Sequence, residues 1–357
     1  MTKSISIDGR LVGEGHPTYV IAEVGCNHNG DLSLAKEMID AAKKAGCDCA
    51  KFQKFTADTF CTNRDKKFTY TSQGQEVTER EYDMFKRFEF DQDQWADLMT
   101  YCRNSGIFFM ATVQDPIDLE QMLELGLKAI KVGSDDFDHF VNLQLFAKTG
   151  LPLIISKGMA DEIEVRKTLD SVRSLTDSLA VLHCVSLYPS EFHHLNLRQI
   201  PRLAAMYPDI VWGFSDHSRG SLGSTLAVAL GAHIIEKHFT LSHDLPGPDQ
   251  WFSMDPGEMS DLVKDIRSCE SALGTGRIEP AEEERAMFKT MRRRIVARDD
   301  LTESTVLSLD TVAFKRSTNG AFISDWGRLA GQRLSKAKRR DEGITIDDLQ
   351  TTGPEDH

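Results

Sequence analysis

Two stretches, Val211-Trp-Gly-Phe-Ser-Asp-His217 and Ile234-Ile-Glu-Lys-His238, have the pattern of buried strands that end in polar side chains. Side chains alternate along a strand, so Ser215 shares a face with the histidine that ends the first stretch. Glu236 likewise shares a face with the histidine that ends the second. If the strands are neighbours in a parallel sheet, two imidazoles, a carboxylate and a hydroxyl meet at one end of it. That group of side chains is suited to a catalytic divalent metal.

Eight short apolar runs that end in polar or glycine signals lie along the chain. We predict strands at residues 19–24, 49–52, 107–111, 129–132, 153–156, 180–184, 210–214 and 234–238. Amphipathic helical segments lie between most of them, the clearest running from Asp31 to Gly46. Eight strand–helix units over about 260 residues predict an α/β fold, a (β/α)8 TIM barrel. An open doubly wound sheet is the alternative.

Changes in composition predict three parts. Residues 1–278 are expected to form a TIM-barrel catalytic domain that begins with a hairpin around Asp8-Gly9. The charged stretch 279–294 is expected to be a linker, and residues 295–357 a small β-rich domain. An insertion at 56–93, rich in Tyr, Phe, Gln and Thr, is either a lid or binding loop or an elaborated surface loop.

Composition limits the classes of function. The chain has 357 residues, is 40% hydrophobic and carries a formal net charge of −13, which disfavours nucleic acid and anionic membranes as partners. No apolar run approaches the roughly 18 residues of a membrane span, and the N-terminal residues lack the apolar segment of a signal peptide. We therefore expect a cytoplasmic protein whose seven scattered cysteines are reduced.

Reactive residues of a barrel lie at the carboxyl ends of its strands, and in this chain those ends are unusually polar. Besides the two histidines they bring Glu23, Lys51, Gln53, Thr112, Lys131, Ser134, Lys157, Ser186 and Tyr188. A lysine inside an apolar strand is expected to have a partner, because burying an unpaired charge is costly. Lys51, Lys131 and Ser134 together are suited to a carboxylate or a phosphate.

Each histidine taken alone has the alternative of a hydrogen-bonded core residue. Taken together, His217 and His238 predict a metal site without thiolates, which fits Mn²⁺ best, with Co²⁺, Zn²⁺ and Fe²⁺ as alternatives and Mg²⁺ less suited. Two protein ligands leave positions for water and a substrate oxygen, so the metal can polarise a carbonyl.

The chain resembles the phosphoenolpyruvate-dependent sialic acid (nonulosonic acid) synthases, a family that includes N-acetylneuraminate synthase. The motifs that carry the resemblance are Ile21-Ala-Glu-Val-Gly-Cys-Asn-His-Asn-Gly30, Lys51-Phe-Gln53, Lys131-Val-Gly-Ser134, Leu182-His-Cys-Val-Ser-Leu-Tyr-Pro189, Gly213-Phe-Ser-Asp-His217, Glu236-Lys-His-Phe239 and Pro246-Gly-Pro-Asp249. The C-terminal segment resembles the antifreeze-like (SAF) domain that ends these synthases.

The resemblance implies a C–C bond-forming transferase of EC 2.5.1 type. Such an enzyme condenses phosphoenolpyruvate with the open-chain aldehyde of an N-acylated mannosamine-type sugar. The products are a sialic acid-like 2-keto-3-deoxy sugar acid and phosphate, which leaves by metal-assisted C–O cleavage. N-acetylmannosamine and its 6-phosphate are candidate sugars. A 2,4-diacetamido-2,4,6-trideoxyhexose, the substrate of a legionaminic or pseudaminic acid synthase, is the alternative.

The resemblance also implies roles for single residues. Glu23, Glu236, His217 and His238 would be catalytic, with the two histidines holding the metal. Substrate contacts would come from Lys51, Gln53, Thr112, Lys131, Ser134, Ser186, Tyr188, Ser215, Asp249 and Arg316. Asp249 would hold a water beside the metal, while Arg316 would reach the sugar of a partner subunit in a domain-swapped homodimer.

Three positions depart from the family pattern. Ser317 follows the arginine where proline is usual, Asp135-Asp136 replaces a glycine and an acid, and Ser186 stands where some members have asparagine. They bear on the acyl-sugar contact, the phosphate loop and one substrate contact, respectively.

Three other functions fit parts of the sequence. A metal-dependent hydrolase of the amidohydrolase type would need His-X-His at the end of the first strand, where Glu23-Val-Gly25 stands. A Schiff-base aldolase would use Lys131 or Lys157. A carbohydrate-binding scaffold with an ice-binding C-terminal domain would need neither.

Overall fold

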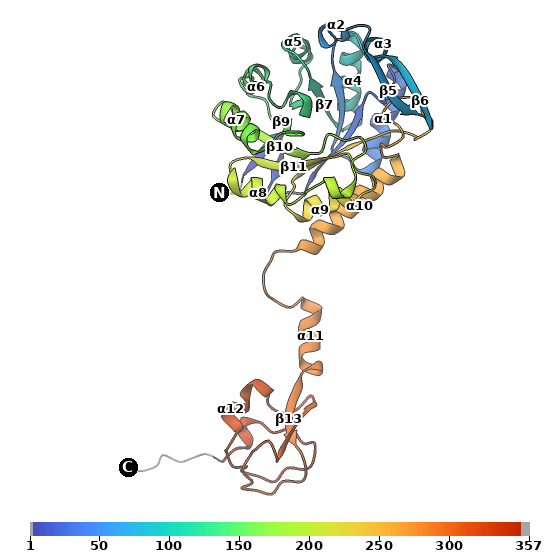
Figure 1. Cartoon of the computed structure of the whole chain (residues 1–357). Coiled ribbons are helices and arrows are strands. Elements are labelled where there is room, and N and C mark those ends of the chain that lie inside the picture. The colour runs from blue at the N-terminus through green and yellow to red at the C-terminus, as the bar shows by residue number, and fades with distance from the viewer. Residues whose placement is uncertain (1–2, 351–357) are drawn as a thin grey trace. The chain divides into compact units, whose positions relative to one another are not determined.

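The structure is a computed structural model that describes residues 3–350. It separates into two compact units, Met1–Gly274 and Thr275–His357. Figure 1 shows the order of elements along the chain.

Eight parallel strands close into a barrel in the order β10-β11-β12-β3-β4-β7-β8-β9. Their bounds are β3 (Tyr19–Gly25), β4 (Cys49–Lys54), β7 (Phe108–Val113), β8 (Ile130–Val132), β9 (Leu153–Ser156), β10 (Leu179–Cys184), β11 (Val211–Asp216) and β12 (Ile234–His238). Each predicted strand lies within two residues of the observed one at both ends. The TIM barrel is confirmed, and the open doubly wound sheet is wrong because β12 pairs with β3 and closes the sheet.

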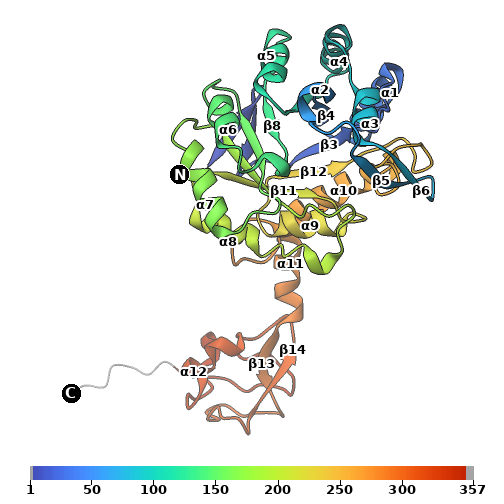
Figure 2. The same ribbon diagram turned by 45° about the horizontal axis from the view of Figure 1, so that its top comes forward.

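Helices surround the barrel on its outer face (Figures 1 and 2). They are α1 (Leu32–Ala45), α4 (Gln92–Ser105), α5 (Pro116–Glu124), α6 (Phe140–Ala147), α7 (Glu162–Val172), α8 (Gln199–Met206), α9 (Leu222–Ala229) and α10 (Pro256–Leu273). The first begins as predicted at Asp31, whose side chain accepts hydrogen bonds from the amides of Ser33 and Leu34. It ends at Gly46, whose φ of 91° suits glycine.

The barrel interior has an apolar layer at the amino ends of the strands. Its buried side chains include Tyr19, Ile21, Cys49, Met110, Ile154, Leu182, Val211 and Ile234. The hairpin of β1 (Ser4–Ile7) and β2 (Arg10–Gly13) adds Ile5, Ile7 and Val12 to the same cluster. Its turn has positive φ at both Asp8 and Gly9, the conformation that matches strand twist in a two-residue hairpin. This layer therefore packs as a dry core beneath the open end of the barrel.

Every second side chain of a strand faces the barrel interior, and these inward residues change from apolar to polar toward the carboxyl end of the strand. Glu23 lies two residues after Ile21, and Lys51 two residues after Cys49. On β11 the inward position below Ser215 is Gly213, where a Cβ atom would lie 2.6 Å from the carbonyl oxygen of Ile234. The polar layer thus lies directly on the apolar one at the carboxyl ends of the strands.

The insertion after β4 is ordered. It contains α2 (Ala57–Phe60), the antiparallel hairpin β5 (Lys67–Ser72) and β6 (Gln75–Arg80), and α3 (Glu81–Phe88). Both ribbon views place the hairpin beside α3 (Figures 1 and 2). The Gln73 amide donates to the Asp244 carbonyl at 2.8 Å, and Ser72 Oγ accepts from the Gly247 amide at 3.0 Å. The hairpin tip is therefore tied to the loop that follows β12.

The C-terminal unit has a small core of its own. Its elements are α11 (Glu282–Met291), β13 (Arg293–Ala297), β14 (Val312–Arg316), η3 (Ile323–Asp325), α12 (Trp326–Leu329) and η4 (Ile346–Asp348). The buried residues are Ile295, Ala297, Leu307, Val312, Leu329, Leu334 and Ile344. The stretch expected as a linker, 279–294, contains the helix α11. The exact boundaries of the three expected parts remain a prediction.

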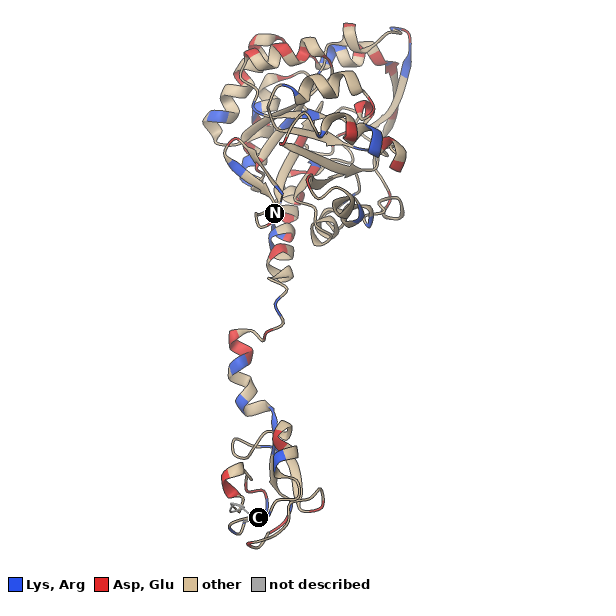
Figure 3. Cartoon of the chain, turned by 90° about the vertical axis from the view of Figure 1, so that its left-hand side faces the viewer, with Lys and Arg blue, Asp and Glu red and all other residues tan. Residues whose placement is uncertain are grey.

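Acidic residues open α11 and basic residues follow them, whereas both signs are interspersed on the helices around the barrel (Figure 3). Among residues 3–350, no helix is both long enough and apolar enough to cross a membrane.

Candidate active site at the carboxyl end of the barrel

A cavity of about 500 Å³ opens at the carboxyl ends of the strands. Twelve of the side chains selected from the sequence line it: Glu23, Lys51, Gln53, Thr112, Lys131, Ser134, Ser186, Tyr188, Ser215, His217, Glu236 and His238. The Asp249 carboxylate lies 3.7 Å from His238 Nδ1, at the edge of the group. Arg316 ends β14 in the C-terminal unit, where it is exposed and pairs in register with Arg293.

Opposite charges alternate at the floor of this cavity. Lys51 Nζ lies 2.7 Å from Glu23 Oε2 and 3.5 Å from Glu236 Oε2. Lys131 Nζ lies 3.8 Å from Glu236 Oε1 and donates to Ser156 Oγ at 2.8 Å. The four charged side chains are at least nine-tenths buried. Each charge therefore compensates its neighbour where water cannot.

The two carboxyl groups differ in proton affinity. Burial, together with the nearby negative charge of Glu236, raises the pKa of Glu23 above its ordinary value. Burial acts on Glu236 in the same direction, but Lys131 and Lys51 outweigh it and lower the pKa of Glu236 to about 2. One carboxylate is thus held ionised, while the other is able to exchange a proton.

The two lysines differ as well. Burial lowers the pKa of Lys131 despite the nearby Glu236 carboxylate. Burial opposes the charge of Lys51 too, but the carboxylates of Glu23 and Glu236 outweigh it and raise the pKa of Lys51. The cavity therefore holds one firmly charged ammonium and one whose charge a bound anion would stabilise.

Hydroxyl groups surround the charges. Lys51 Nζ donates to Thr112 Oγ1 at 3.1 Å, and Ser215 Oγ donates to Glu236 Oε1 at 2.8 Å. The hydroxyls of Ser134 and Ser186 lie 2.8 Å apart. These groups, with the two ammonium groups, form a lining that can hold an anion.

The imidazoles of His217 and His238 lie with ring centroids 5.4 Å apart. His217 Nδ1 is 2.7 Å from the carbonyl oxygen of Val185, so Nδ1 carries the hydrogen and Nε2 keeps its lone pair. His238 Nδ1 is buried and has no hydrogen-bond partner among the described residues. Burial lowers the pKa of each to about 3. Neutral imidazoles with free nitrogens are the form that binds a metal ion.

Tyr188 and Asp249 lie beside these imidazoles. The Tyr188 ring is 4.1 Å from that of His217 and 5.8 Å from that of His238, measured between centroids. Burial raises the pKa of the Asp249 carboxyl, although about a quarter (26%) of its side chain is accessible. Gln53 donates to Glu23 Oε1 at 2.8 Å and thereby orients that carboxyl.

A buried ion pair on the outer face of the strands fixes the two histidines. Asp216 and Lys237, which alternate with the inward residues, lie 2.9 Å apart. Asp216 also accepts hydrogen bonds from the Ser218 amide and the Ser224 hydroxyl. The ends of β11 and β12 are therefore held by contacts that the cavity itself does not use.

Some cavity residues were not expected from the sequence. Ser156 lines the cavity, whereas the neighbouring Lys157, the expected residue of this strand, points to the outer face. Strand parity relative to the inward Ile154 predicts Ser156 rather than Lys157. The structure also adds Phe55, Phe60, Phe68, Phe85, Gln114, Asp135, Met159 and Cys184. Most of these lie on loops or in the insertion, where periodicity carries no signal.

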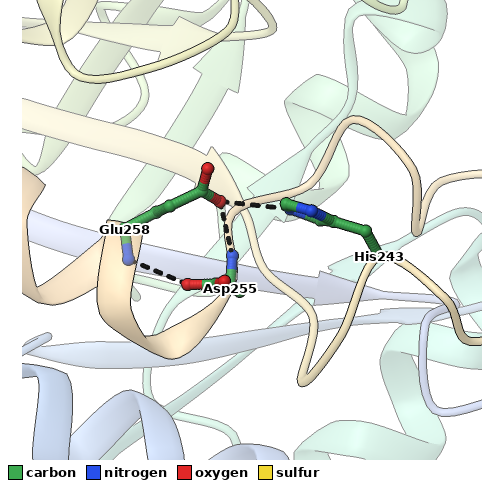
Figure 4. Close-up of side chains that lie close together, drawn as sticks. All are labelled: His243, Asp255 and Glu258. Atoms are coloured by element: carbon green, nitrogen blue, oxygen red, sulfur yellow. Dashed lines mark hydrogen bonds and ion pairs between the residues drawn. The ribbon is translucent and has the colours of Figure 1, made fainter.

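A separate group of possible metal ligands, His243, Asp255 and Glu258, lies at the start of α10 (Figure 4). Glu258 Oε2 accepts hydrogen bonds from the Asp255 amide at 3.0 Å and from His243 Nε2 at 3.1 Å. Asp255 Oδ1 accepts from the Glu258 amide at 2.9 Å. The Asp255 and Glu258 contacts are a capping box of the helix, and the separate His243 contact brings the third side chain beside them.

Known proteins share this architecture. The NeuB family profile matches residues 38–278, and the SAF domain profile matches residues 292–350. The chain belongs to the NeuB family. It is 39% identical over 328 residues to N,N'-diacetyllegionaminic acid synthase of Legionella pneumophila, covering 90% of this chain and 92% of that one. It is 38% identical over 338 residues to human N-acetylneuraminate-9-phosphate synthase, covering 94% of each.

A solved structure agrees with these relatives. The crystal structure of an N-acetylneuraminic acid (sialic acid) synthetase from Leptospira borgpetersenii has a TM-score of 0.72 and 32% identity. It covers 81% of this chain and 96% of its own. The family, the C-terminal SAF domain and the class of enzyme expected from the sequence are confirmed. The relatives' names differ in the sugar acid that they form, so they leave the sugar open.

Buried neutral histidines make the fold sensitive to acid. Burial lowers the pKa of His28, which stacks on Phe90 at 4.3 Å, to about 3. Between pH 6.5 and 3 the unfolded chain binds a proton that the folded chain does not, so stability falls as pH falls. Each such histidine contributes roughly 1.4 kcal/mol per pH unit in this range. We expect urea unfolding of metal-free protein to show a smaller pH slope for His28→Gln, but an unchanged slope for the exposed control His194→Gln. Equal slopes in all three proteins would contradict this account.

Proposed function

We propose that this chain condenses phosphoenolpyruvate with the aldehyde of an N-acylated mannosamine-type sugar. The products would be a 2-keto-3-deoxy sugar acid and phosphate. The observation that carries the proposal is the pairing, within one cavity, of an anion-binding lining with two neutral histidines. An amidohydrolase or a binding scaffold has no need of the first, and a Schiff-base aldolase has no need of the second.

The anion-binding lining suits phosphoenolpyruvate. Lys51, Lys131 and Thr112 would hold its carboxylate and phosphate together with the hydroxyls of Ser134, Ser186 and Ser215. Without an anion, Glu23 and Glu236 balance the positive charges of the two lysines. A bound anion would pair with the lysines in place of these carboxylates. The volume of about 500 Å³ lies within the usual range for a small-molecule site and has room for both substrates.

The donor set also fits a divalent metal, which His217 and His238 would hold and of which Mn²⁺ is the best match. When bound, the metal supplies Lewis-acid polarisation of the sugar aldehyde. The residues provide the rest of the site: Val185 fixes the tautomer of His217, Tyr188 packs on its ring, and Asp249 faces Nδ1 of His238.

Proton transfer is assigned to Glu23. As C3 of phosphoenolpyruvate attacks the aldehyde carbon, positive charge develops at C2, and water adds there. Glu23, whose pKa is raised by burial, would accept one proton of this water and deliver it to the phosphate that leaves by C–O cleavage. The second proton of the water would pass from the C2 hydroxyl to the former aldehyde oxygen, which becomes a hydroxyl as C2 becomes the ketone. Glu236, held ionised by the two lysines, would stabilise the developing positive charge.

The cavity lining favours an unphosphorylated sugar. Phe55, Phe60 and Phe85 line it as a cluster, with 5.0 Å between the ring centroids of Phe85 and each of the other two. Four cations of the nearby insertion are held in ion pairs: Arg64 with Asp58, Lys66 with Glu81, Lys86 with Glu89, and Arg87 with Glu79. An apolar wall suits the methyl groups of acetamido or 6-deoxy substituents and leaves a 6-phosphate uncompensated. N-acetylmannosamine and 2,4-diacetamido-2,4,6-trideoxyhexoses therefore remain the candidate substrates.

A single assay tests the function and the sugar preference. Protein with Mn²⁺ and phosphoenolpyruvate is expected to release phosphate only when a suitable N-acyl hexosamine is added, and chelation with EDTA should abolish that release until Mn²⁺ is restored. N-acetylmannosamine or a diacetamido-trideoxyhexose should have a higher kcat/KM than N-acetylmannosamine 6-phosphate. Absence of sugar-dependent release across the panel would refute the function. A preference for the 6-phosphate would refute only the sugar assignment.

Replacement of the proton-transfer residue tests its role. Glu23→Gln keeps the shape and the hydrogen bond with Gln53 but cannot take up a proton at pH 7. We expect kcat to fall by more than ~10²-fold while calorimetry still detects phosphoenolpyruvate binding. Glu124→Gln, at the exposed end of α5, is a control for the loss of one negative charge. Near-normal turnover of Glu23→Gln would exclude the assignment.

The role of Arg316 is a proposal about the assembly. We propose that this exposed arginine completes the sugar site of a second subunit in a domain-swapped homodimer. Arg316→Ala and His238→Ala should each be inactive, and mixing the two should restore part of the activity, since one site of a mixed dimer keeps both residues. Arg293→Ala, opposite Arg316 in register, is the control. A mixture that forms mixed dimers and remains inactive would argue against the swap.

A further inference from the structure

A second cavity lies on the outer face of the barrel between α7 and α8, which are neighbours in both ribbon views (Figures 1 and 2). Its volume is about 300 Å³, the space that about ten water molecules fill in the liquid. It is lined by Lys157, Ala160, Asp161, Glu162, Val165, Gln199, Arg202, Leu203 and Met206. None of these residues is required by the proposed reaction.

Lys157 is the unusual group in this cavity. Only 3% of the residue is exposed, and no hydrogen bond or ion pair joins its Nζ to any residue between 3 and 350. Nζ is not among the fully enclosed unpartnered atoms, so it is reached through the cavity. Burial lowers the pKa of Lys157. A buried ammonium is costly unless an acceptor reaches it, so this position calls for a partner from the cavity.

The other charged groups of the lining already have partners. Arg202 pairs with Glu162 at 2.8 Å. Asp161 Oδ1 accepts from the amides of Ile163 and Glu164 as the cap of α7. One positive charge is therefore left to attract an anion, while two carboxylates repel a second negative charge on it. The remaining walls, Val165, Leu203 and Met206 among them, are apolar.

We propose that this outer cavity binds a small monocarboxylate with an apolar body, whose carboxylate pairs with Lys157. A single negative charge matches the single free ammonium, and the apolar body matches the walls. Inorganic phosphate, which carries more charge and has no apolar part, fits less well.

The outer cavity is separated from the catalytic cavity by a wall one chain thick. From the last residue of β9 onward, Ser156 and Met159 line the catalytic cavity, whereas Lys157 and Ala160 line the outer one. Between them lies Gly158, with φ of 36°, so close to the anion-binding hydroxyls that a Cβ there would be 2.2 Å from Ser134 Cβ and 2.7 Å from Ser186 Oγ. A carboxylate that pulls on Lys157 therefore acts on the backbone against which these serines pack. We expect binding at the outer cavity to change the affinity of the catalytic cavity for phosphoenolpyruvate.

Calorimetric titration with hexanoate tests the site without reference to catalysis. We expect saturable binding with a dissociation constant of about 1 mM or lower. Lys157→Met, which keeps the length but not the charge, should weaken it at least ~10-fold. Lys167→Met, an exposed lysine on α7, should leave it unchanged. Ala160→Leu, which fills the cavity and keeps the lysine, should also abolish binding and covers the case in which Lys157→Met fails to fold.

Other outcomes would overturn the site. No saturable heat with hexanoate would mean that the cavity holds only water. Binding that survives both Lys157→Met and Ala160→Leu would place hexanoate elsewhere, and tighter binding of inorganic phosphate would contradict the monocarboxylate assignment.

Coupling is tested by titrating phosphoenolpyruvate with and without saturating hexanoate, which should change its dissociation constant by about fivefold or more in wild-type protein. An unchanged constant would overturn the coupling while leaving the site. Failure of phosphoenolpyruvate to bind at all would count against the proposed function and remove the coupling, whereas the hexanoate titration would still decide the site.

Discussion

The candidate site depends on the mutual compensation of four buried charges, Glu23, Lys51, Glu236 and Lys131. They lie on strands that close the barrel, directly above its apolar layer. Neither an isolated carboxylate nor an isolated ammonium would be tolerated at this depth. In alternation they hold two ammonium groups that could bind an anion, and they set the two carboxyl groups to different proton affinities. The ion pairs that offset the cost of burying these charges are thus the same contacts that set the pKa values of the site.

Closure of the barrel gives each strand two distinct faces. On β11 and β12 the inward residues line the candidate site, while Asp216 and Lys237 form a buried pair outside it. After β9 the same alternation sends Ser156 into the catalytic cavity and Lys157 into the outer one. The two cavities, which differ in chemistry, are therefore lined by alternate residues of one segment, 156–160. A small shift of this segment would change the shape of both cavities.

Most of the inner site could be predicted from the sequence because strand periodicity is a local property. Parity put Ser215 with His217 and Glu236 with His238, and the expected pairing of the two parallel strands brought all four together, as the cavity shows. Parity also distinguishes Ser156 from Lys157 once the neighbouring Ile154 is recognised as inward. The phenylalanine cluster was beyond such reasoning, since α2 and α3 meet there only after the insertion folds back on itself. Arg316 lies in the C-terminal unit, so the role proposed for it concerns the assembly and could not be judged from the barrel strands.

By itself, the sequence determined the eight-strand barrel, its polar carboxyl end and the family to which the chain belongs. Alternating burial and short motifs involve residues that are close in sequence. They can therefore be recognised without knowing how distant parts of the chain pack. Only the tertiary structure decided which charges pair, which histidine nitrogens remain free and that the buried Lys157 has no partner among residues 3–350. Those properties depend on distances between strands remote in sequence and on the exclusion of water from between them. The free ammonium of Lys157, in particular, follows from the packing of α7 and α8 around it.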